Sequence, residues 1–250
     1  MINPKVVSTV EVRMGSTRLP GKSMKLIQGK PTLEILLERL ARSKRVDQIV
    51  VATTVKREDD IIEHLCERLG YPCYRGSSEN VTLRVAEAAR GANADIIAEI
   101  TGDCILTCAE VVDEAIEYFL SHDIDYLSNL MEQTYPQGVD IRVFGAKDLM
   151  SNAEIVTATN DIPGQDHVYL YFEEHPEKYR IYRMKAPPEY YRPEWRLDLD
   201  YEEDLELLRI IFDSLYPNKP DFTLKDLVAW LDINPQYITI NQRMYRKPLR

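Results

Sequence analysis

The feature that most constrains the fold is a regular alternation of two hydrophobic patterns along the first 130 residues. Short continuous apolar runs, typical of buried strands, occur at residues 5–12, 48–54, 72–76, 95–103 and 125–130. Segments with apolar residues at helical spacing separate them, at residues 32–44, 59–70, 81–92 and 109–122. This alternation predicts an α/β protein with a Rossmann-like, mostly parallel sheet that carries helices on both faces.

The pattern changes near residue 131. Residues 137–150 indicate a strand followed by a short helix, and residues 178–187 indicate a strand rich in Tyr and Arg. Residues 201–216 and 223–234 have the spacing of amphipathic helices. Since no repeat, low-complexity segment or flexible linker interrupts the chain, we expect a single domain over residues 1–250, whose second half completes the sheet and covers the site.

The charge of the chain narrows the class of partner. Its 31 basic and 41 acidic residues give a net charge of -10, whereas a nucleic-acid polymer requires a broad positive surface. Any anion that binds is therefore expected to be small and locally held. No apolar run approaches the roughly 18 residues of a membrane span, and the first residues lack the layout of a signal peptide, so we expect a cytoplasmic protein with no membrane partner.

The loop "EVRMGSTRLPGK", residues 11–22, directly follows the first predicted strand. Ligands of open parallel sheets bind beyond the carboxyl ends of the strands, which is where this loop would lie. Gly15 and Gly21 allow backbone amides to turn toward anionic oxygens, and Arg13, Arg18 and Lys22 supply positive charge. A solvated surface loop is the competing interpretation. Three cations immediately after a buried strand favour a phosphate-binding loop, with a triphosphate as its ligand, although the spacing is not that of a Walker motif.

Two further segments follow predicted strands, Thr53–Thr54 and "TGDC" at residues 101–104. The carboxylate of Asp103 would project into the same crevice, where a hard oxygen ligand suits Mg²⁺. Asp198 and Asp200 alternate along the predicted strand in "RLDLDYEEDLE" and would share one face. From the residues alone either acid could meet Asp103, and acids before a helix often cap it instead.

Several of these motifs resemble a known family. It is the spore-coat polysaccharide type of cytidylyltransferase, a relative of the sialic acid and Kdo activating enzymes. The resemblance spans roughly residues 5 to 215 and rests on "RMGSTRLPGK", "GKPTLEILLERLARSKRVDQIVVATT", "TGDC", "YPQGVDIRVF" and "RLDLDYEEDLELLR".

This resemblance implies a nucleotide-diphospho-sugar transferase (GT-A-like) fold, CTP as donor, Mg²⁺ as cofactor and release of pyrophosphate. Residues 1–130 would form the nucleotide-binding half and residues 131–250 the acceptor-binding and oligomerisation half. Asp103 and Asp200 would hold the metal and, with Arg13 and Lys22, would form the catalytic set. The expected nucleotide-binding residues are Glu11, Arg13, Gly15, Ser16, Thr17, Arg18, Lys22, Thr53, Thr54 and Arg84.

The chain departs from the family pattern at several positions. Glu11 and Val12 stand where the family usually shows a glutamine and a small residue, and a carboxylate near the base would also suit the donors of guanine. A nucleotidyltransferase of the same fold that uses GTP or UTP with a sugar phosphate is therefore an alternative to CMP transfer onto an acidic sugar or similar anionic acceptor for surface polysaccharide or glycoconjugate synthesis. A non-catalytic nucleotide-binding protein is a third hypothesis.

The acceptor side and the assembly are expectations of the same kind. Asp140, His167 and Arg196 are the candidate acceptor contacts, although a single His beside tyrosines is more often a structural hydrogen-bonding residue. The basic and aromatic residues 179–196 could expose Arg180 and Tyr182 to the crevice or could form an oligomer interface. We expect a homodimer.

Overall fold

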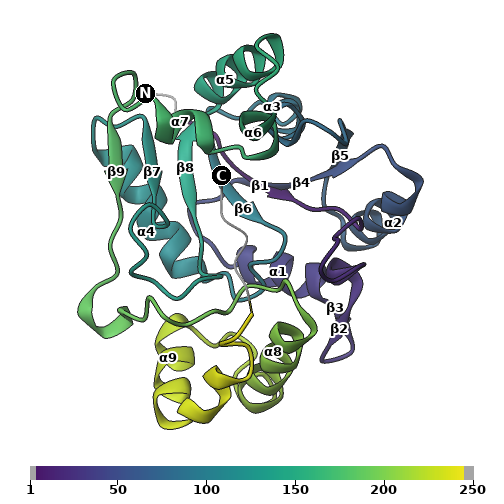
Figure 1. Ribbon diagram of the computed structural model, residues 1–250, viewed down its shortest axis with the longest axis vertical. Helices are drawn as coiled ribbons and strands as arrows, with labels where there is room; N and C mark the ends of the chain where they lie inside the picture. Colours follow the sequence, from purple (N-terminus) through teal and green to yellow (C-terminus); the bar gives the residue numbers. More distant parts are fainter. Residues whose placement is uncertain (1–3, 245–250) are drawn as a thin grey trace.

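A seven-stranded sheet forms the centre of the computed structural model, which describes residues 4–244 (Figure 1). Its strand order is β5-β4-β1-β6-β8-β7-β9. Strands β5, β4, β1 and β6 are parallel, β8 is antiparallel to both of its neighbours, and β9 is parallel to β7. The predicted mostly parallel sheet is confirmed. The strands are Val6–Glu11 (β1), Gln48–Thr54 (β4), Cys73–Gly76 (β5), Ile96–Thr101 (β6), Tyr126–Ser128 (β7), Arg142–Gly145 (β8) and Ile181–Arg183 (β9).

Helices cover both faces of this sheet (Figure 1). One face packs against α3 (Val81–Gly91), α5 (Ala146–Ala158) and α7 (Leu170–Glu174), with α6 (Ile162–Asp166) beside α3. The opposite core contains side chains of α1 (Thr32–Leu40), α2 (Asp60–Leu69), α4 (Ala109–Ser121), α8 (Glu202–Leu215) and α9 (Leu224–Ile233). No helix within residues 4–244 is long and apolar enough to cross a membrane.

The central strands are buried on both faces, which explains their continuous apolar sequences. Along β1, Val7 packs into the core beneath α3 and α5, while Val6 and Val10 face the core that contains α1 and α4. This alternation follows from the two-residue period of a strand. Because β4, β1 and β6 run parallel, their carboxyl ends meet at one edge of the sheet, as the sequence predicts.

The second half of the chain differs from the prediction in its details. Strand β8 begins only at Arg142, and the helix after it is longer than expected. Residues 196–200, predicted as a strand, form no strand; an isolated bridge between Gln137 and Arg196 and a hydrogen bond from the N–H of Leu199 to the carbonyl of Asp103 join them to the fold. Gly138 allows a close backbone contact with this segment, since it has φ +93 and an added Cβ would lie 2.6 Å from the backbone of Leu197. The short helices α6 and α7 and the hairpin β2 (Leu26–Ile27) to β3 (Lys30–Pro31) were not predicted.

One buried ion pair joins the parallel part of the sheet to its antiparallel part. Glu99 on β6 and Arg142 on β8 are directly paired in register, and Arg142 Nη1 lies 2.8 Å from Glu99 Oε2. Both side chains are buried, and the guanidinium also lies 4.0 Å from the centre of the Tyr169 ring. Burial is the largest single effect and opposes the charge of Arg142, but Glu99, Tyr126 and Tyr169 together outweigh it and raise the pKa of the guanidinium well above its usual value.

Removal of one partner of this pair should therefore destabilise the fold strongly. We expect Arg142→Met to lower the free energy of unfolding by about 3–5 kcal/mol, because it leaves the Glu99 carboxylate buried without its cation. The double variant Arg142→Met/Glu99→Leu should recover most of that loss. Urea unfolding would measure both, with the exposed Arg90→Met as control. A single variant no less stable than the control would contradict the prediction.

Candidate active site

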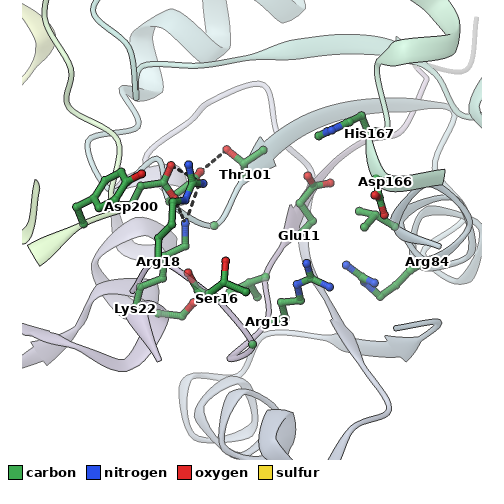
Figure 2. Close-up of a pocket in the computed structure, with 18 residues that line it drawn as sticks. Glu11, Arg13, Ser16, Arg18, Lys22, Arg84, Thr101, Asp166, His167 and Asp200 are labelled. Carbon is green, nitrogen blue, oxygen red and sulfur yellow. Dashed lines mark hydrogen bonds and ion pairs between the residues drawn. The ribbon is translucent and has the colours of Figure 1, made fainter. Parts of the chain in front are cut away.

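A cavity of about 610 Å³ opens at the carboxyl ends of β1 and β6 (Figure 2). Its walls come from the loop after β1, the turn after β6, helix α3, the end of α6 and the start of α8. Many predicted site residues line it, namely Glu11, Arg13, Gly15, Ser16, Thr17, Arg18, Lys22, Arg84, Asp103, His167 and Asp200. The other lining residues are Val12, Ser23, Val81, Thr101, Gly102, Asp166 and Tyr201.

The loop after β1 is anchored from beneath by the strand beside it. The backbone N–H of Met14 donates to Asp59 Oδ1 at 2.7 Å, and the hydroxyl of Thr54 donates to Asp59 Oδ2. Thr53, Thr54 and Asp59 are all buried, and the two threonines do not line the cavity. Thr53 and Thr54, predicted to contact the nucleotide, therefore lie behind the loop and not in the cavity. Thr54 supports the loop through Asp59.

The loop and the turn after β6 are packed against each other without space for a side chain. The N–H of Gly102 donates to the carbonyl of Glu11 at 2.9 Å, and an added Cβ at Gly102 would lie 2.8 Å from that oxygen. Next to this contact, Thr101 Oγ1 donates to Asp103 Oδ1 at 2.6 Å. Asp103 is thus oriented by its own turn toward the cation-bearing loop.

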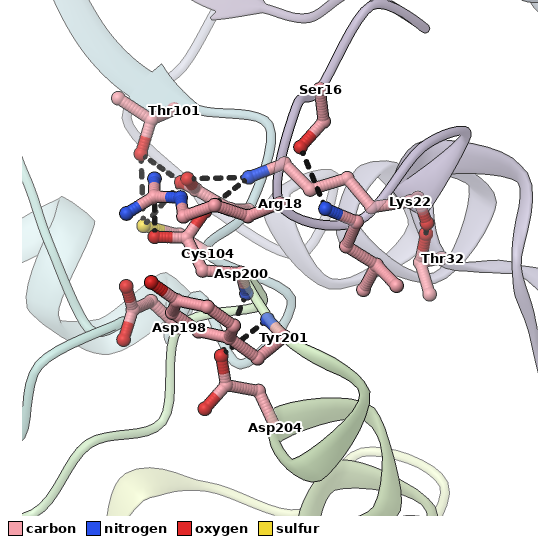
Figure 3. Close-up of polar contacts among 12 residues, drawn as sticks. Ser16, Arg18, Lys22, Thr32, Thr101, Cys104, Asp198, Asp200, Tyr201 and Asp204 are labelled. Atoms are coloured by element: carbon pink, nitrogen blue, oxygen red, sulfur yellow. Dashed lines mark hydrogen bonds and ion pairs between the residues drawn. The ribbon is translucent and has the colours of Figure 1, made fainter. Parts of the chain in front are cut away.

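The ammonium of Lys22 connects the two predicted metal carboxylates. Its Nζ lies 2.9 Å from Asp103 Oδ2 and 2.9 Å from Asp200 Oδ1 (Figure 3). Burial opposes ionisation of Lys22 and Asp103, but the attraction of Lys22 to the two carboxylates, together with the hydrogen bond from Thr101 to Asp103, outweighs it. As a result the pKa of Lys22 is raised, and the pKa of Asp103 is lowered to about 2.

Asp200 is brought to this point by hydrogen bonds of its own segment. The N–H of Leu199 donates to the carbonyl of Asp103 at 3.0 Å, and Arg18 Nη2 lies 2.7 Å from Asp200 Oδ2. The N–H groups of Asp200 and Tyr201 both donate to Asp204 Oδ2 at 2.8 Å. Asp204 is therefore the acid that caps α8, and the carboxylate of Asp200 faces the cations of the loop.

The structure also answers which of the two alternating acids meets Asp103. Asp200 shares the Lys22 ammonium with it, whereas Asp198 is buried outside the cavity lining, 3.5 Å from Arg196. Burial, with a further contribution from Asp103, raises the pKa of Asp198 to about 7. The choice of Asp200 made from the resemblance thus agrees with the geometry.

The donor set suits a hard divalent cation that also binds ligand phosphates. Asp103 and Asp200 direct one oxygen each at a common cation, and Mg²⁺ is typically held by one or two carboxylates together with substrate phosphates. Within residues 4–244 no group of three or more His, Cys, Asp or Glu side chains is arranged to hold a metal ion. Any Mg²⁺ at this pair would therefore depend on phosphate oxygens for further ligands.

The opposite end of the cavity has a different character. Glu11, Arg13 and Arg84 lie there together, with Asp166 and His167 above them (Figure 2). Arg84 is almost fully buried and donates through Nη1 to the carbonyl of Ser77. This end offers a mixture of hydrogen-bond donors and acceptors beside the apolar Val81.

The predicted acceptor residues do not gather at one place. His167 lines the cavity, whereas Asp140 and Arg196 do not. Asp140 accepts the N–H of Gly138 at 3.0 Å, and Arg196 pairs with Asp204 at 3.1 Å, so both support the segments that position Asp200.

The crevice interpretation of the Tyr- and Arg-rich strand is wrong. Arg180 pairs with Asp125 at 2.7 Å, and Tyr182 stacks on Tyr118 with ring centres 3.9 Å apart. Neither residue lines the cavity. Arg180 thus binds the segment just before β7, and Tyr182 packs on α4.

Sequence reasoning missed residues of two kinds. Thr101 and Gly102 stand within the quoted "TGDC" motif, so the rule on strand ends could have found them. Asp59 and Asp166 carry no comparable signal, because Asp59 binds Met14 from a segment 45 residues away and Asp166 lies in α6, a helix that was not predicted.

Loss of the Asp59 carboxylate should loosen the loop after β1. In Asp59→Ala the amide of Met14 and the hydroxyl of Thr54 lose their acceptor, so we expect faster amide exchange across residues 12–21 and a loss of about 1–3 kcal/mol in stability. Hydrogen exchange measured by mass spectrometry would show this, with the exposed Glu67→Ala as control. Unchanged exchange in residues 12–21 would show that the loop is held by other contacts.

Comparison with known proteins places these residues in a family. The family model described as Cytidylyltransferase matches residues 8–219. The spore coat polysaccharide biosynthesis protein SpsF of Bacillus subtilis is 31% identical over 238 residues, which cover 94% of this chain and 97% of that protein. A 3-deoxy-manno-octulosonate cytidylyltransferase of Pelobacter propionicus is 27% identical over 243 residues, covering 96% and 82% of the two chains.

A solved structure agrees with the sequence comparisons. The cytidylyltransferase from Leptospira borgpetersenii superposes with a TM-score of 0.85 at 31% identity, over 97% of this chain and 98% of that one. This chain, in which the cation-bearing loop and the paired acids meet, is thus similar to that cytidylyltransferase over nearly its whole length. This protein is a nucleotidyltransferase that belongs to the cytidylyltransferase family.

Proposed function

We propose that this enzyme transfers CMP from CTP to an anionic acceptor, an acidic sugar or sugar phosphate, with Mg²⁺ as cofactor and with release of pyrophosphate. One observation carries the proposal. Asp103 and Asp200 converge on the cation-bearing loop at the carboxyl ends of β1 and β6. The names of the relatives support the product class, since one is a spore coat polysaccharide biosynthesis protein and another is a 3-deoxy-manno-octulosonate cytidylyltransferase.

The chemistry requires an acceptor oxygen to attack the α-phosphorus of the nucleotide while the bond to the β-phosphate oxygen breaks. Arg18 and Lys22 lie beside the paired acids, and Arg13 lies farther along the same loop toward Glu11, so the three can hold an extended triphosphate and offset the repulsion between two anions. When bound, Mg²⁺ would neutralise phosphate charge and polarise the α-phosphoryl group. Asp103 and Asp200 are the residues that would hold it.

The Lys22 ammonium has a further part in this arrangement. It lies between the two carboxylates, 2.9 Å from an oxygen of each. Since Lys22 lines the cavity beside both carboxylates, its flexible ammonium can also pair with phosphate oxygens of a bound nucleotide. Lys22 would then stabilise the pyrophosphate as it leaves.

The test is pyrophosphate release with each of CTP, UTP, GTP and ATP in the presence of Mg²⁺ and a panel of acidic sugars and sugar phosphates. We expect turnover with CTP and with at least one acceptor that carries a carboxylate or phosphate. Selective turnover with GTP or UTP would identify that nucleotide as the donor and contradict CTP. Nucleotide binding without pyrophosphate from any acceptor would contradict catalysis of this kind.

Asp103→Asn should separate the metal-binding role from folding. We expect a loss of roughly 100-fold or more in kcat, because a neutral amide is a poor ligand for Mg²⁺ and leaves the developing phosphate charge less stabilised. The unfolding midpoint should change little, and Glu206→Gln, an exposed residue on α8, serves as the matched control. Activity equal to that of the control would exclude Asp103 as a metal ligand.

A further inference from the structure

The ring of Tyr201 lies against two arginines that come from different segments. Tyr201 lines the cavity at the start of α8. The guanidinium carbon of Arg18, in the loop after β1, lies 5.6 Å from the centre of this ring, and that of Arg196, in the segment before α8, lies 5.4 Å from it. Both distances fall within the roughly 6 Å over which an aromatic face attracts a cation. The ring is therefore a contact shared by two cations.

The same two arginines also share one carboxylate oxygen. Asp200 Oδ2 lies 2.7 Å from Arg18 Nη2 and 3.6 Å from Arg196 Nη2. Two guanidinium groups this close repel each other, and a carboxylate together with an aromatic face offsets that repulsion. Asp200 and Tyr201 are neighbours in the sequence and lie together beside Arg18 (Figure 3). One short segment thus supplies both groups that hold the cations.

The two arginines differ in how firmly they are held. Arg196 also lies 3.1 Å from Asp204, and its side chain is 11% exposed. The side chain of Arg18 is 34% exposed, and its polar and ring partners within residues 4–244 are Asp200 and Tyr201. A long arginine side chain in a cavity has many rotamers, and restricting them costs free energy. Loss of the ring should therefore affect the position of Arg18 more than that of Arg196.

Tyr201 is itself fixed through its backbone. Its N–H donates to Asp204 Oδ2 at 2.8 Å, and the same oxygen accepts the N–H of Asp200 at 2.8 Å. These hydrogen bonds use backbone donors, so a substitution of the Tyr201 side chain leaves them in place. The ring can therefore be removed without removal of the contacts that position this end of α8.

We propose that Tyr201 is a positioning residue for Arg18, a role that rests on the proposed function. The ring face holds the guanidinium beside Asp200, on the side of the cavity where the triphosphate is proposed to bind. Arg18 can then pair with a phosphate oxygen with little further loss of rotamer freedom. A group positioned in advance strengthens binding, because less conformational entropy is lost on association. Tyr201 thus raises the affinity for the nucleotide by acting through Arg18.

Two other roles of the ring lead to different expectations. A direct contact between the ring and the ligand would persist when the Arg18 guanidinium is absent, whereas a positioning role would disappear with it. A purely structural role would lower the unfolding midpoint, and its effect would not depend on Arg18. A double-variant cycle that combines substitutions of Tyr201 and Arg18 separates the positioning role from both.

The experiment measures Kd for CTP with Mg²⁺ by titration calorimetry on the full-length protein. It compares the wild type with Tyr201→Leu, Tyr201→Phe, Arg18→Ala and the double variant Arg18→Ala/Tyr201→Leu. The phenylalanine variant keeps the ring, and Tyr191→Leu, at an exposed tyrosine outside the cavity lining, is the matched control. Unfolding midpoints of the ligand-free variants show that each is folded. Tyr201→Gln takes the place of Tyr201→Leu if the leucine variant does not fold.

We expect Tyr201→Leu to raise the Kd for CTP about 5- to 30-fold, the range that corresponds to one cation–π contact in a partly desolvated site. Tyr201→Phe and Tyr191→Leu should stay within about threefold of the wild type, because the ring remains beside Arg18 in both. Arg18→Ala should weaken binding at least as much as Tyr201→Leu does. In the Arg18→Ala background, Tyr201→Leu should change the Kd by less than about threefold, since the ring then has no guanidinium to position.

Three results would overturn the inference alone. They are an unchanged Kd in Tyr201→Leu, a Kd in Tyr201→Phe as high as in Tyr201→Leu, and an effect of Tyr201→Leu that has the same size with and without Arg18. Failure of the wild type to bind any nucleoside triphosphate would instead contradict the proposed function, so the two failures are distinguishable.

Discussion

The Lys22 ammonium, held between Asp103 and Asp200, is the interaction on which the site depends. It joins three segments that are distant in sequence, the loop after β1, the turn after β6 and the extended segment before α8. A largely buried ion pair of this kind contributes little net stability, because desolvation offsets the attraction. The ion pair instead fixes the geometry of the site. One cation sets the separation of two carboxylates that would otherwise repel each other.

The rest of the cavity also depends on which acidic side chains are paired with cations. The protein has a net charge of -10, yet the loop after β1 carries several cations, and Arg18 and Lys22 in it are paired with Asp103 and Asp200. At the other end the matching is incomplete, since Glu99 binds Arg142 and the Oε2 atom of Glu11 has no hydrogen-bond partner within residues 4–244. Local clustering of cations can therefore give an acidic protein a site that suits a small anion.

Much of the site could be predicted because the strand-end rule acts through local sequence. Residues that directly follow β1 and β6, such as Lys22 and Asp103, line the cavity as expected. The rule was less useful at β4, where Thr54 ends the strand but faces Asp59 behind the loop. It also says nothing of Asp140 and Arg196, whose partners are Gly138 and Asp204. Whether a polar side chain faces a ligand or a neighbouring segment depends on packing, which spacing alone does not determine.

The sequence by itself determined the α/β architecture, the edge of the sheet that carries the site and the cationic loop, because hydrophobic periodicity and residue order act over a few residues at a time. Only the tertiary structure decided that Asp200 rather than Asp198 meets Asp103, since that choice depends on the close approach at Gly138 and on the capping of α8 by Asp204. The environment of Glu11 was likewise decided by strand register and by the partner of Arg142. These are contacts between segments up to 178 residues apart, and no local pattern encodes which of the possible pairings has the lowest free energy.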